Sequence, residues 1–145
     1  SGGLIMSVTH AVKQEQIDDD PADFPRINER HTGLRNEVGY LTGWSSLPEH
    51  GGGTFDMVSR LDMRTGAKSS FQCGPGRTTG EAIFAPDPAG TNEDDGWLLS
   101  YVYDAATDKS DVMILDAHDP AQGPVATVHL PRRAPFGFHG SWLAE

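Results

Sequence analysis

The stretch WLLSYVY, at residues 97–103, predicts a β-strand because it is rich in aromatic and branched side chains. Residues 112–115, which read VMIL, follow it across a polar turn. The next apolar stretch is VATVHL at residues 125–130, where apolar residues alternate with Thr127 and His129. Such alternation has the period of a half-buried strand. The three stretches together predict an antiparallel sheet.

Further strands are predicted upstream of this region. Residues 54–62 and 68–73 flank the sequence RTG at 64–66, which predicts a hairpin. Residues 37–41 and 82–85 are two more candidates. The chain has 145 residues with 17 Gly and 10 Pro, and no stretch of ten residues keeps a helical period. We therefore predict an all-β fold.

The spacing of these strands describes antiparallel meander blades. Residues 81–130 hold four strands, the content of one β-propeller blade, and residues 37–73 hold most of a second. Two blades cannot close a ring, so residues 1–145 are expected to form only part of a propeller. The chain begins Ser1-Gly2-Gly3 rather than with Met, which we interpret as a cut from something longer.

Charge and composition exclude several classes of protein. The net charge of −10 disfavours binding to nucleic acid or to an anionic membrane, because the field of the protein repels phosphate. A single Cys excludes an internal disulfide. The sequence contains no apolar run long enough to span a membrane and no secretory signal at its start. We therefore expect a cytoplasmic location.

Several local motifs favour a structural interpretation over a functional one. The acidic runs at 18–20 and 93–95 lack the ligand spacing of a calcium loop and are expected to be solvated loops. His50-Gly51-Gly52-Gly53 copies an esterase oxyanion loop, but no Gly-x-Ser-x-Gly accompanies it. Residues 74–80 lack the Lys of a phosphate loop and are expected to connect two strands. Cys73 is expected to be a small strand residue.

Six histidines are the remaining candidates for metal ligands: His10, His31, His50, His118, His129 and His139. No two of them have helical i, i+4 spacing, and none lies near a pair of cysteines. A useful transition-metal site needs three or four ligands, so spacing alone identifies no site.

Four stretches together resemble a known family. They are DFPRIN at 23–28, GEAIFAP at 80–86 followed by EDDGWLLS at 93–100, PFGFHGSW at 135–142, and VSRLDMRTG at 58–66. In order and content they resemble the C-terminal part of the carotenoid cleavage oxygenases. That family includes the lignostilbene dioxygenases and the retinal pigment epithelium isomerase.

The resemblance implies a seven-bladed propeller whose axis carries Fe(II) bound by four His. It also implies cleavage of a conjugated carbon–carbon double bond by O2 to give two carbonyl products. His139 matches the last iron ligand of the family, and Glu81 matches the carboxylate that orients it. Asp23 matches a second such carboxylate, usually Glu, whose own His lies outside this chain. Asp is one methylene shorter than Glu, so its carboxylate reaches less far.

The resemblance also leaves alternatives open. Phe136 and Phe138 either line an apolar tunnel for a conjugated substrate or belong to the propeller core. Gly140 either lets the backbone approach the axis or is an ordinary turn glycine. The other three iron ligands should lie in other blades, so the chain alone is expected to bind iron weakly and to be inactive. A non-catalytic β-rich interaction module, or an inactive truncated relative, is the alternative function.

Overall fold

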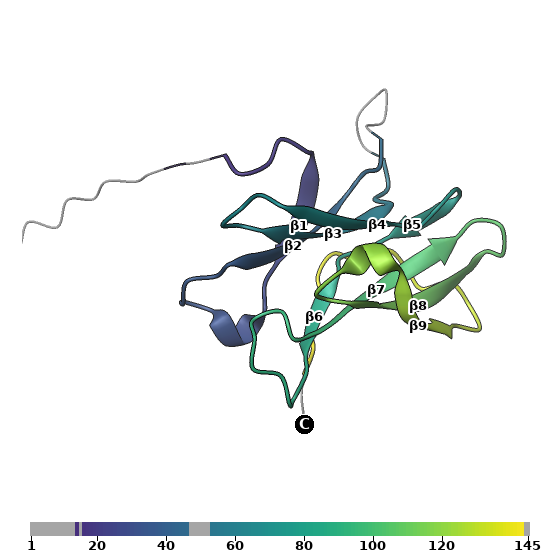
Figure 1. Cartoon of the computed structure of the whole chain (residues 1–145). Helices are drawn as coiled ribbons and strands as arrows, with labels where there is room; N and C mark the ends of the chain where they lie inside the picture. Colours follow the sequence, from purple (N-terminus) through teal and green to yellow (C-terminus); the bar gives the residue numbers. More distant parts are fainter. Residues whose placement is uncertain (1–13, 15, 47–52, 144–145) are drawn as a thin grey trace, which may run out of the picture.

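The computed structural model describes residues 14, 16–46 and 53–143, and its strands form two antiparallel sheets (Figure 1). The first sheet consists of β1 (Ala22–Arg26), β2 (Val38–Gly43), β3 (Met57–Asp62) and β4 (Lys68–Gln72). A short 3-10 helix, η1 (Glu29–His31), connects β1 to β2. Each strand pairs with the next along the chain, so this sheet is a meander.

The second sheet consists of β5 (Arg77–Thr79), β6 (Ile83–Pro86), β7 (Gly96–Asp104), β8 (Lys109–Asp116) and β9 (Pro124–His129), with the 3-10 helix η2 (Pro120–Gln122) before β9. Both β5 and β6 pair with β7, one at each end of it. They are therefore two halves of one interrupted strand, and the sheet has the four-strand width of a propeller blade. The expected all-β, antiparallel fold is confirmed.

The predicted hairpin between β3 and β4 is also confirmed. Gly66 has a φ of 75°, a left-handed conformation that glycine adopts at no steric cost. Its N–H donates to the carbonyl of Asp62 at 2.8 Å. The Asp62 carboxylate accepts from the N–H groups of Arg64 and Thr65, both at 2.9 Å. These bonds fix the turn that returns the chain along the sheet.

Two expectations about the second sheet were wrong. Residues 77–79 form β5, although the whole segment 74–80 had been expected to be a connection. The sequence pattern that would predict this strand is weak, because the strand is three residues long, polar and bounded by glycines. The segment 125–130 was expected to be half-buried, yet every residue of β9 is exposed. β9 lies at the edge of the sheet, and no described segment covers either of its faces.

The acidic run 93–95 joins the two sheets, which corrects the expectation of a solvated loop. The Glu93 carboxylate accepts from the backbone N–H groups of Glu37 and Val38 at 3.0 Å, where β2 begins. The Asn28 amide donates to the Glu93 carbonyl at 2.9 Å. Because these partners lie at the start of β2 and in the connection between β1 and β2, Glu93 fastens the loop before β7 to that part of the first sheet.

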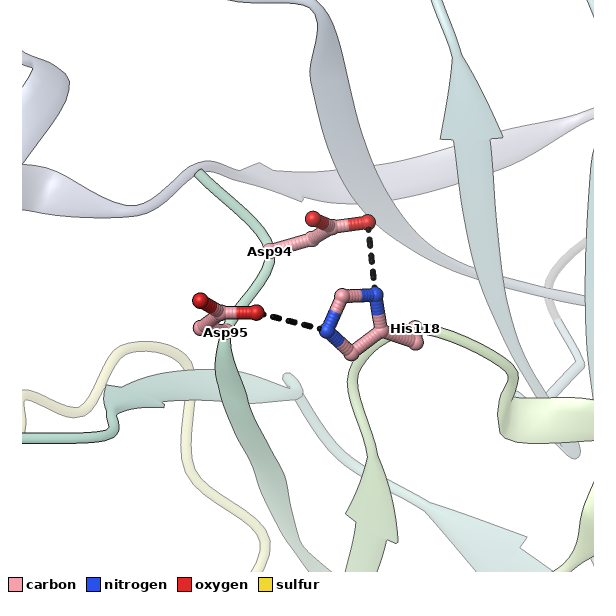
Figure 2. Close-up of side chains that lie close together, drawn as sticks. All are labelled: Asp94, Asp95 and His118. Carbon is pink, nitrogen blue, oxygen red and sulfur yellow. Dashed lines mark hydrogen bonds and ion pairs between the residues drawn. The ribbon is translucent and has the colours of Figure 1, made fainter. Parts of the chain in front are cut away.

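His118 and two aspartates form the centre of this junction (Figure 2). Asp94 forms an ion pair with Arg60 of β3 at 2.7 Å and lies 3.1 Å from His118 Nδ1. Asp95 lies 2.8 Å from His118 Nε2. The side chains of Asp94 and Asp95 are only 15% and 20% exposed. We call Arg60, Asp94, Asp95 and His118 the acidic clasp. The other run, 18–20, is only partly solvated, because Lys68 contacts Asp18 and Asp20.

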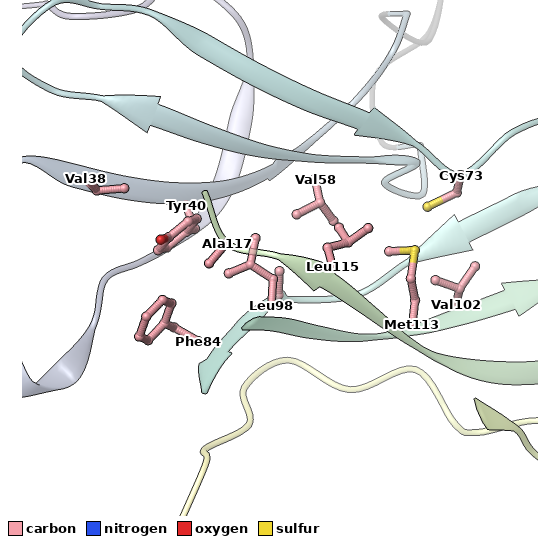
Figure 3. Close-up of a cluster of buried hydrophobic side chains, with 11 residues drawn as sticks. Val38, Tyr40, Val58, Cys73, Phe84, Leu98, Val102, Met113, Leu115 and Ala117 are labelled. Atoms are coloured by element: carbon pink, nitrogen blue, oxygen red, sulfur yellow. The ribbon is translucent and has the colours of Figure 1, made fainter. Parts of the chain in front are cut away.

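The apolar core fills the space between the sheets (Figure 3). Tyr40 of β2 stacks on Phe84 of β6 with ring centroids 5.4 Å apart. Leu98 and Leu115 are each 1% exposed, and burying a leucine contributes about 1.5–3 kcal/mol. The other members of the cluster are Val38, Val58, Cys73, Ala82, Val102, Met113 and Ala117. One face of each sheet is thus apolar and turned toward its neighbour.

The interruption between β5 and β6 keeps several hydrogen bonds to β7. Gly80 donates its N–H to the Tyr101 carbonyl at 3.1 Å. The Ser100 hydroxyl lies 3.1 Å from the carbonyl oxygens of both Gly80 and Glu81. The Ser100 hydroxyl contacts backbone carbonyls that have no partner in the strand ladder. The backbone at Glu81 can therefore leave the regular strand geometry with little loss of stability.

Candidate metal centre

The segment after β9 has no regular secondary structure and is fastened to the second sheet by side chains. Ala134 donates its N–H to the Ser110 hydroxyl at 3.0 Å. The Arg133 guanidinium lies over the rings of both Tyr103 and Phe136, at 4.6 and 4.9 Å from their centroids. Such contacts are cation–π interactions. They bring the following residues back to the interrupted strand.

Glu81 and His139 meet at this interruption, although 58 positions separate them in the sequence. His139 Nδ1 lies 3.1 Å from Glu81 Oε1, and the Gly140 N–H donates to Oε2 at 2.9 Å. The Glu81 side chain is 4% exposed, whereas that of His139 is 72% exposed. A carboxylate at Nδ1 leaves Nε2 as the ring nitrogen with a free lone pair. The structure thus brings together two of the three predicted site residues.

Gly140 makes a close approach to β6. A Cβ at this position would lie 2.5 Å from Ile83 Cδ1, and the backbone does not have a positive φ. The close contact of Gly140 is thus with the Ile83 side chain, while approach of its backbone to the propeller axis stays a prediction.

We expect Gly140→Ala to lower the free energy of unfolding by about 1 kcal/mol, because the added methyl displaces the Ile83 side chain. Urea denaturation of the 145-residue chain measures this change. Ile83→Val removes the contacting methyl, so the double variant should lose less than the sum of the two single variants. Strict additivity would show that the contact is not responsible.

Arg26 is a partner of Glu81 that the sequence interpretation missed. Its Nη1 lies 3.3 Å from Glu81 Oε1, and its Nη2 lies 2.6 Å from Glu29 Oε1. The residue was quoted within the DFPRIN stretch, but nothing in the sequence connects it to a carboxylate 55 positions away. The Glu81 carboxylate is therefore contacted by three residues from two segments of the chain.

Asp23 lies at the irregular part of β1, and its described contact is local. Its Oδ1 accepts from the Phe24 N–H at 2.7 Å, and the residue is exposed. Phe24, in contrast, packs edge-on against the His139 ring with centroids 5.6 Å apart. Phe55 lies 5.3 Å from Phe24, which extends the aromatic surface beside His139. The predicted histidine partner of Asp23 is not among the described residues, so the role of Asp23 stays a prediction.

A pocket of about 170 Å³ opens beside Glu81 and His139. Phe136 and Phe138 line it, together with Tyr101. Both phenylalanines are largely exposed, at 60% and 79%. Within the described residues they line this pocket and are not part of the buried cluster, and their role as a tunnel lining stays a prediction.

The other described histidines offer no comparable site. In the acidic clasp, Asp94, Asp95 and His118 each offer one ligand atom within 4.8 Å of the others, but the two aspartates face different nitrogens of the His118 ring (Figure 2). The Asp95 oxygens also accept from the Asn92 and Thr91 N–H groups, and these contacts, together with His118, hold the pKa of Asp95 below its ordinary value. The described contacts of the clasp are therefore the Arg60–Asp94 ion pair and the close approach of His118 to both aspartates.

His129 contacts Asp111 at 2.8 Å on the exposed strand β9, and His31 belongs to η1. His10 and His50 lie outside the described residues, as does most of the motif at 50–53. Cys73 was expected to be a small strand residue, but it lies directly after the end of β4, where it is buried. Burial raises the pKa of its thiol to about 11, so it is a poor nucleophile.

In the described part of the chain, no helix has the length and apolar character needed to cross a membrane.

Comparison with known proteins places this geometry in a family. Residues 4–144 match the family model described as "Retinal pigment epithelial membrane protein". The chain is 36% identical to a carotenoid cleavage oxygenase of Mycobacterium tuberculosis over 136 residues, which cover 92% of this chain and 27% of that protein. It is 35% identical to a carotenoid 9,10(9',10')-cleavage dioxygenase of Pisum sativum over 147 residues, which cover 94% and 27%.

A crystal structure supports the same relationship. Cobalt-substituted Synechocystis apocarotenoid oxygenase superposes with a TM-score of 0.85 at 29% identity, over 93% of this chain and 28% of the other. The structures matched in this way are seven-bladed propeller enzymes, which confirms the predicted fold class. The chain spans about a quarter of the length of these relatives. It belongs to the family of carotenoid cleavage oxygenases and the retinal pigment epithelial membrane protein.

Proposed function

We propose that this chain supplies His139 as one ligand of an Fe(II) centre in an oxygenase that cleaves a conjugated carbon–carbon double bond with O2. The observation that carries the proposal is the contact of His139 Nδ1 with Glu81 Oε1. A histidine that ligates a metal uses one ring nitrogen, while the other donates to an acceptor that fixes the tautomer. The donor set therefore fits a metal ligand, with Nε2 as the ligating atom.

The names of the relatives support the chemistry proposed. Those proteins are a carotenoid cleavage oxygenase and a carotenoid 9,10(9',10')-cleavage dioxygenase, and the matched crystal structure is cobalt-substituted. We infer a substrate of the carotenoid, apocarotenoid or stilbene class. The remaining ligands would come from other propeller blades, since one imidazole cannot hold a transition metal tightly.

Iron, when bound, would supply a centre that binds and activates dioxygen. The residues of this chain would orient and enclose that centre. Glu81 accepts the Nδ1 hydrogen and fixes the angle of the His139 ring. The Gly140 N–H holds the second oxygen of Glu81, so the carboxylate cannot rotate freely. Phe24 packs on the ring and, with Phe136 and Phe138, presents apolar surface to a conjugated substrate.

A segment exchange tests the proposal. Residues 4–144 of this chain would replace the matching segment of Synechocystis apocarotenoid oxygenase, and the chimera would be assayed for iron content and for apocarotenoid cleavage. We expect stoichiometric iron and measurable cleavage. A folded chimera without iron would refute the proposal.

In this chimera, Glu81→Gln should weaken metal binding by about 10- to 100-fold, the usual cost of losing the partner of a ligating histidine. Competition with a metallochromic chelator measures the affinity. Glu37→Gln makes the same chemical change at an exposed residue far from His139 along the sequence, and it should leave the affinity unchanged. Equal affinities in the two variants would remove Glu81 from the site.

One observation favours the alternative of an interaction module. Every residue of the edge strand β9 is exposed, and such an edge can pair with another strand. Size-exclusion chromatography of the 145-residue chain distinguishes the two cases. A discrete complex would favour the interaction module. Aggregates would favour a part of a propeller whose exposed edges need the remaining blades.

A further inference from the structure

Arg26 holds the carboxylate that orients His139, and it does so from the opposite sheet. Its Nη1 lies 3.3 Å from Glu81 Oε1, the same oxygen that faces His139 Nδ1 at 3.1 Å. Its Nη2 lies 2.6 Å from Glu29. The Arg26 side chain is 16% exposed and that of Glu81 is 4% exposed, so solvent screens their contact only partly.

A bulge in β1 explains why Arg26 points toward Glu81. Asp23 pairs with Thr42, and Arg26 pairs with Tyr40, so two residues of β1 lie opposite the single residue Leu41. In a regular strand, residues three apart would face opposite sides of the sheet. The extra residue in the bulge returns Arg26 to the side of its partner Tyr40.

The Tyr40 side is the inner side, because its ring stacks on Phe84 of the second sheet. Phe24 accommodates the extra residue with a φ of 49°, a conformation that non-glycine residues rarely adopt. Strained backbone of this kind is concentrated at functional sites. The bulge thus directs a cationic side chain of the first sheet at a carboxylate of the second.

The donors around Glu81 determine which hydrogen-bonding role each atom takes. A guanidinium and a backbone N–H can only donate. Arg26 on Oε1 and Gly140 on Oε2 therefore favour a carboxylate that accepts at both oxygens. Facing an accepting Oε1, His139 Nδ1 must carry the hydrogen, and Nε2 keeps its lone pair.

We propose that Arg26 is a positioning residue that selects the Nδ1–H tautomer of His139 through Glu81. The inference rests on the proposed function for its biological meaning, because the selected tautomer is the one whose Nε2 can ligate a metal. A purely structural Arg26 would join the two sheets without any effect on the tautomer.

The tautomer can be measured directly in the 145-residue chain without metal. Two-bond 1H–15N spectra of protein labelled at histidine, recorded at about pH 8.5 where an ordinary histidine is neutral, distinguish the two forms. We expect His139 to be mainly Nδ1–H. In Arg26→Gln, Glu81 loses the contact that holds Oε1 against Nδ1. The ratio of Nδ1–H to Nε2–H should therefore fall about tenfold, the equilibrium change expected when the hydrogen bond from Nδ1 to the carboxylate is lost.

Two further variants complete the test. Arg26→Lys keeps a cationic donor but lacks the planar guanidinium group. In this variant the ratio of Nδ1–H to Nε2–H should also fall, but only about threefold. It also provides the measurement if Arg26→Gln does not fold. Arg64→Gln alters an arginine that is 64% exposed and contacts Asp62, and it should change nothing. The inference is overturned if the wild-type ring is mainly Nε2–H, or if its tautomer ratio is the same in the folded Arg26 variants.

This result is separable from the test of the proposed function. An Arg26-dependent tautomer in a chain whose chimera binds no iron would uphold the inference and refute the iron centre. A chimera that binds iron, together with a tautomer ratio that does not depend on Arg26, would refute the inference and uphold the iron centre.

Discussion

His139→Ala should remove iron from the chimera that carries this chain. The change deletes the one ligand that we assign to these residues and leaves an incomplete site. We expect the metal affinity to fall by more than about 100-fold, which exceeds the usual effect of removing a residue behind a ligand. Iron content after gel filtration, measured by inductively coupled plasma mass spectrometry, gives the result.

The matched control for this experiment is His129→Ala. His129 is 83% exposed on β9 and contacts Asp111, so its loss makes the same chemical change away from Glu81. Its iron content should equal that of the unmodified chimera. His139→Gly supplemented with free imidazole should recover part of the iron, because the added ring can occupy the space of the missing one. Full iron in His139→Ala would exclude His139 as a ligand.

Asp94→Ala should cause the largest loss of stability among the polar substitutions considered. Asp94 contacts Arg60 on one side and His118 on the other, and its side chain is 15% exposed. Removing it leaves the Arg60 guanidinium largely buried without its carboxylate. We expect the free energy of unfolding of the 145-residue chain to fall by about 2–3 kcal/mol in urea denaturation.

Asp20→Ala is the comparison for this substitution. Asp20 pairs with Lys68 at 2.8 Å but is 65% exposed, and Lys68 keeps its contact with Asp18. Exposed ion pairs contribute about 0–1 kcal/mol, so the loss should be small. If the two substitutions cost the same, the acidic clasp does not join the sheets. A double-mutant cycle of Asp94→Ala with Arg60→Ala isolates the energy of the pair itself.

The strands could be predicted where the sequence repeats with the period of a pleated sheet. Residues 97–103 lie within β7, where the buried residues Leu98, Ser100 and Val102 alternate with more exposed ones. Residues 68–73 coincide with β4 apart from Cys73, because the turn at 64–66 marks where the hairpin returns. The short strand β5 and the exposure of β9 could not be predicted. The formation of β5 and the exposure of β9 both depend on which strands lie beside them. The alternation of apolar and polar residues in the sequence does not identify those neighbours.

The contacts of the charged residues were the least predictable part. Composition suggested that Glu93, Asp94 and Asp95 face solvent, yet their partners include Arg60, 34 positions away, and His118. In the same way, Glu81 and His139 were paired through family resemblance, and the structure supplied Arg26 as the third member. Long-range electrostatic partners arise from topology and leave no local pattern.

The two predicted carboxylates share one property of their backbone. Asp23 borders the bulge of β1, and Glu81 lies in the interruption between β5 and β6. At both places the regular ladder of hydrogen bonds is broken, although Asp23 itself still pairs with Thr42. Such a break changes the direction in which neighbouring side chains point, so it can direct a carboxylate where a regular strand would not. Irregular backbone in the two sheets therefore coincides with the positions of the two predicted carboxylates.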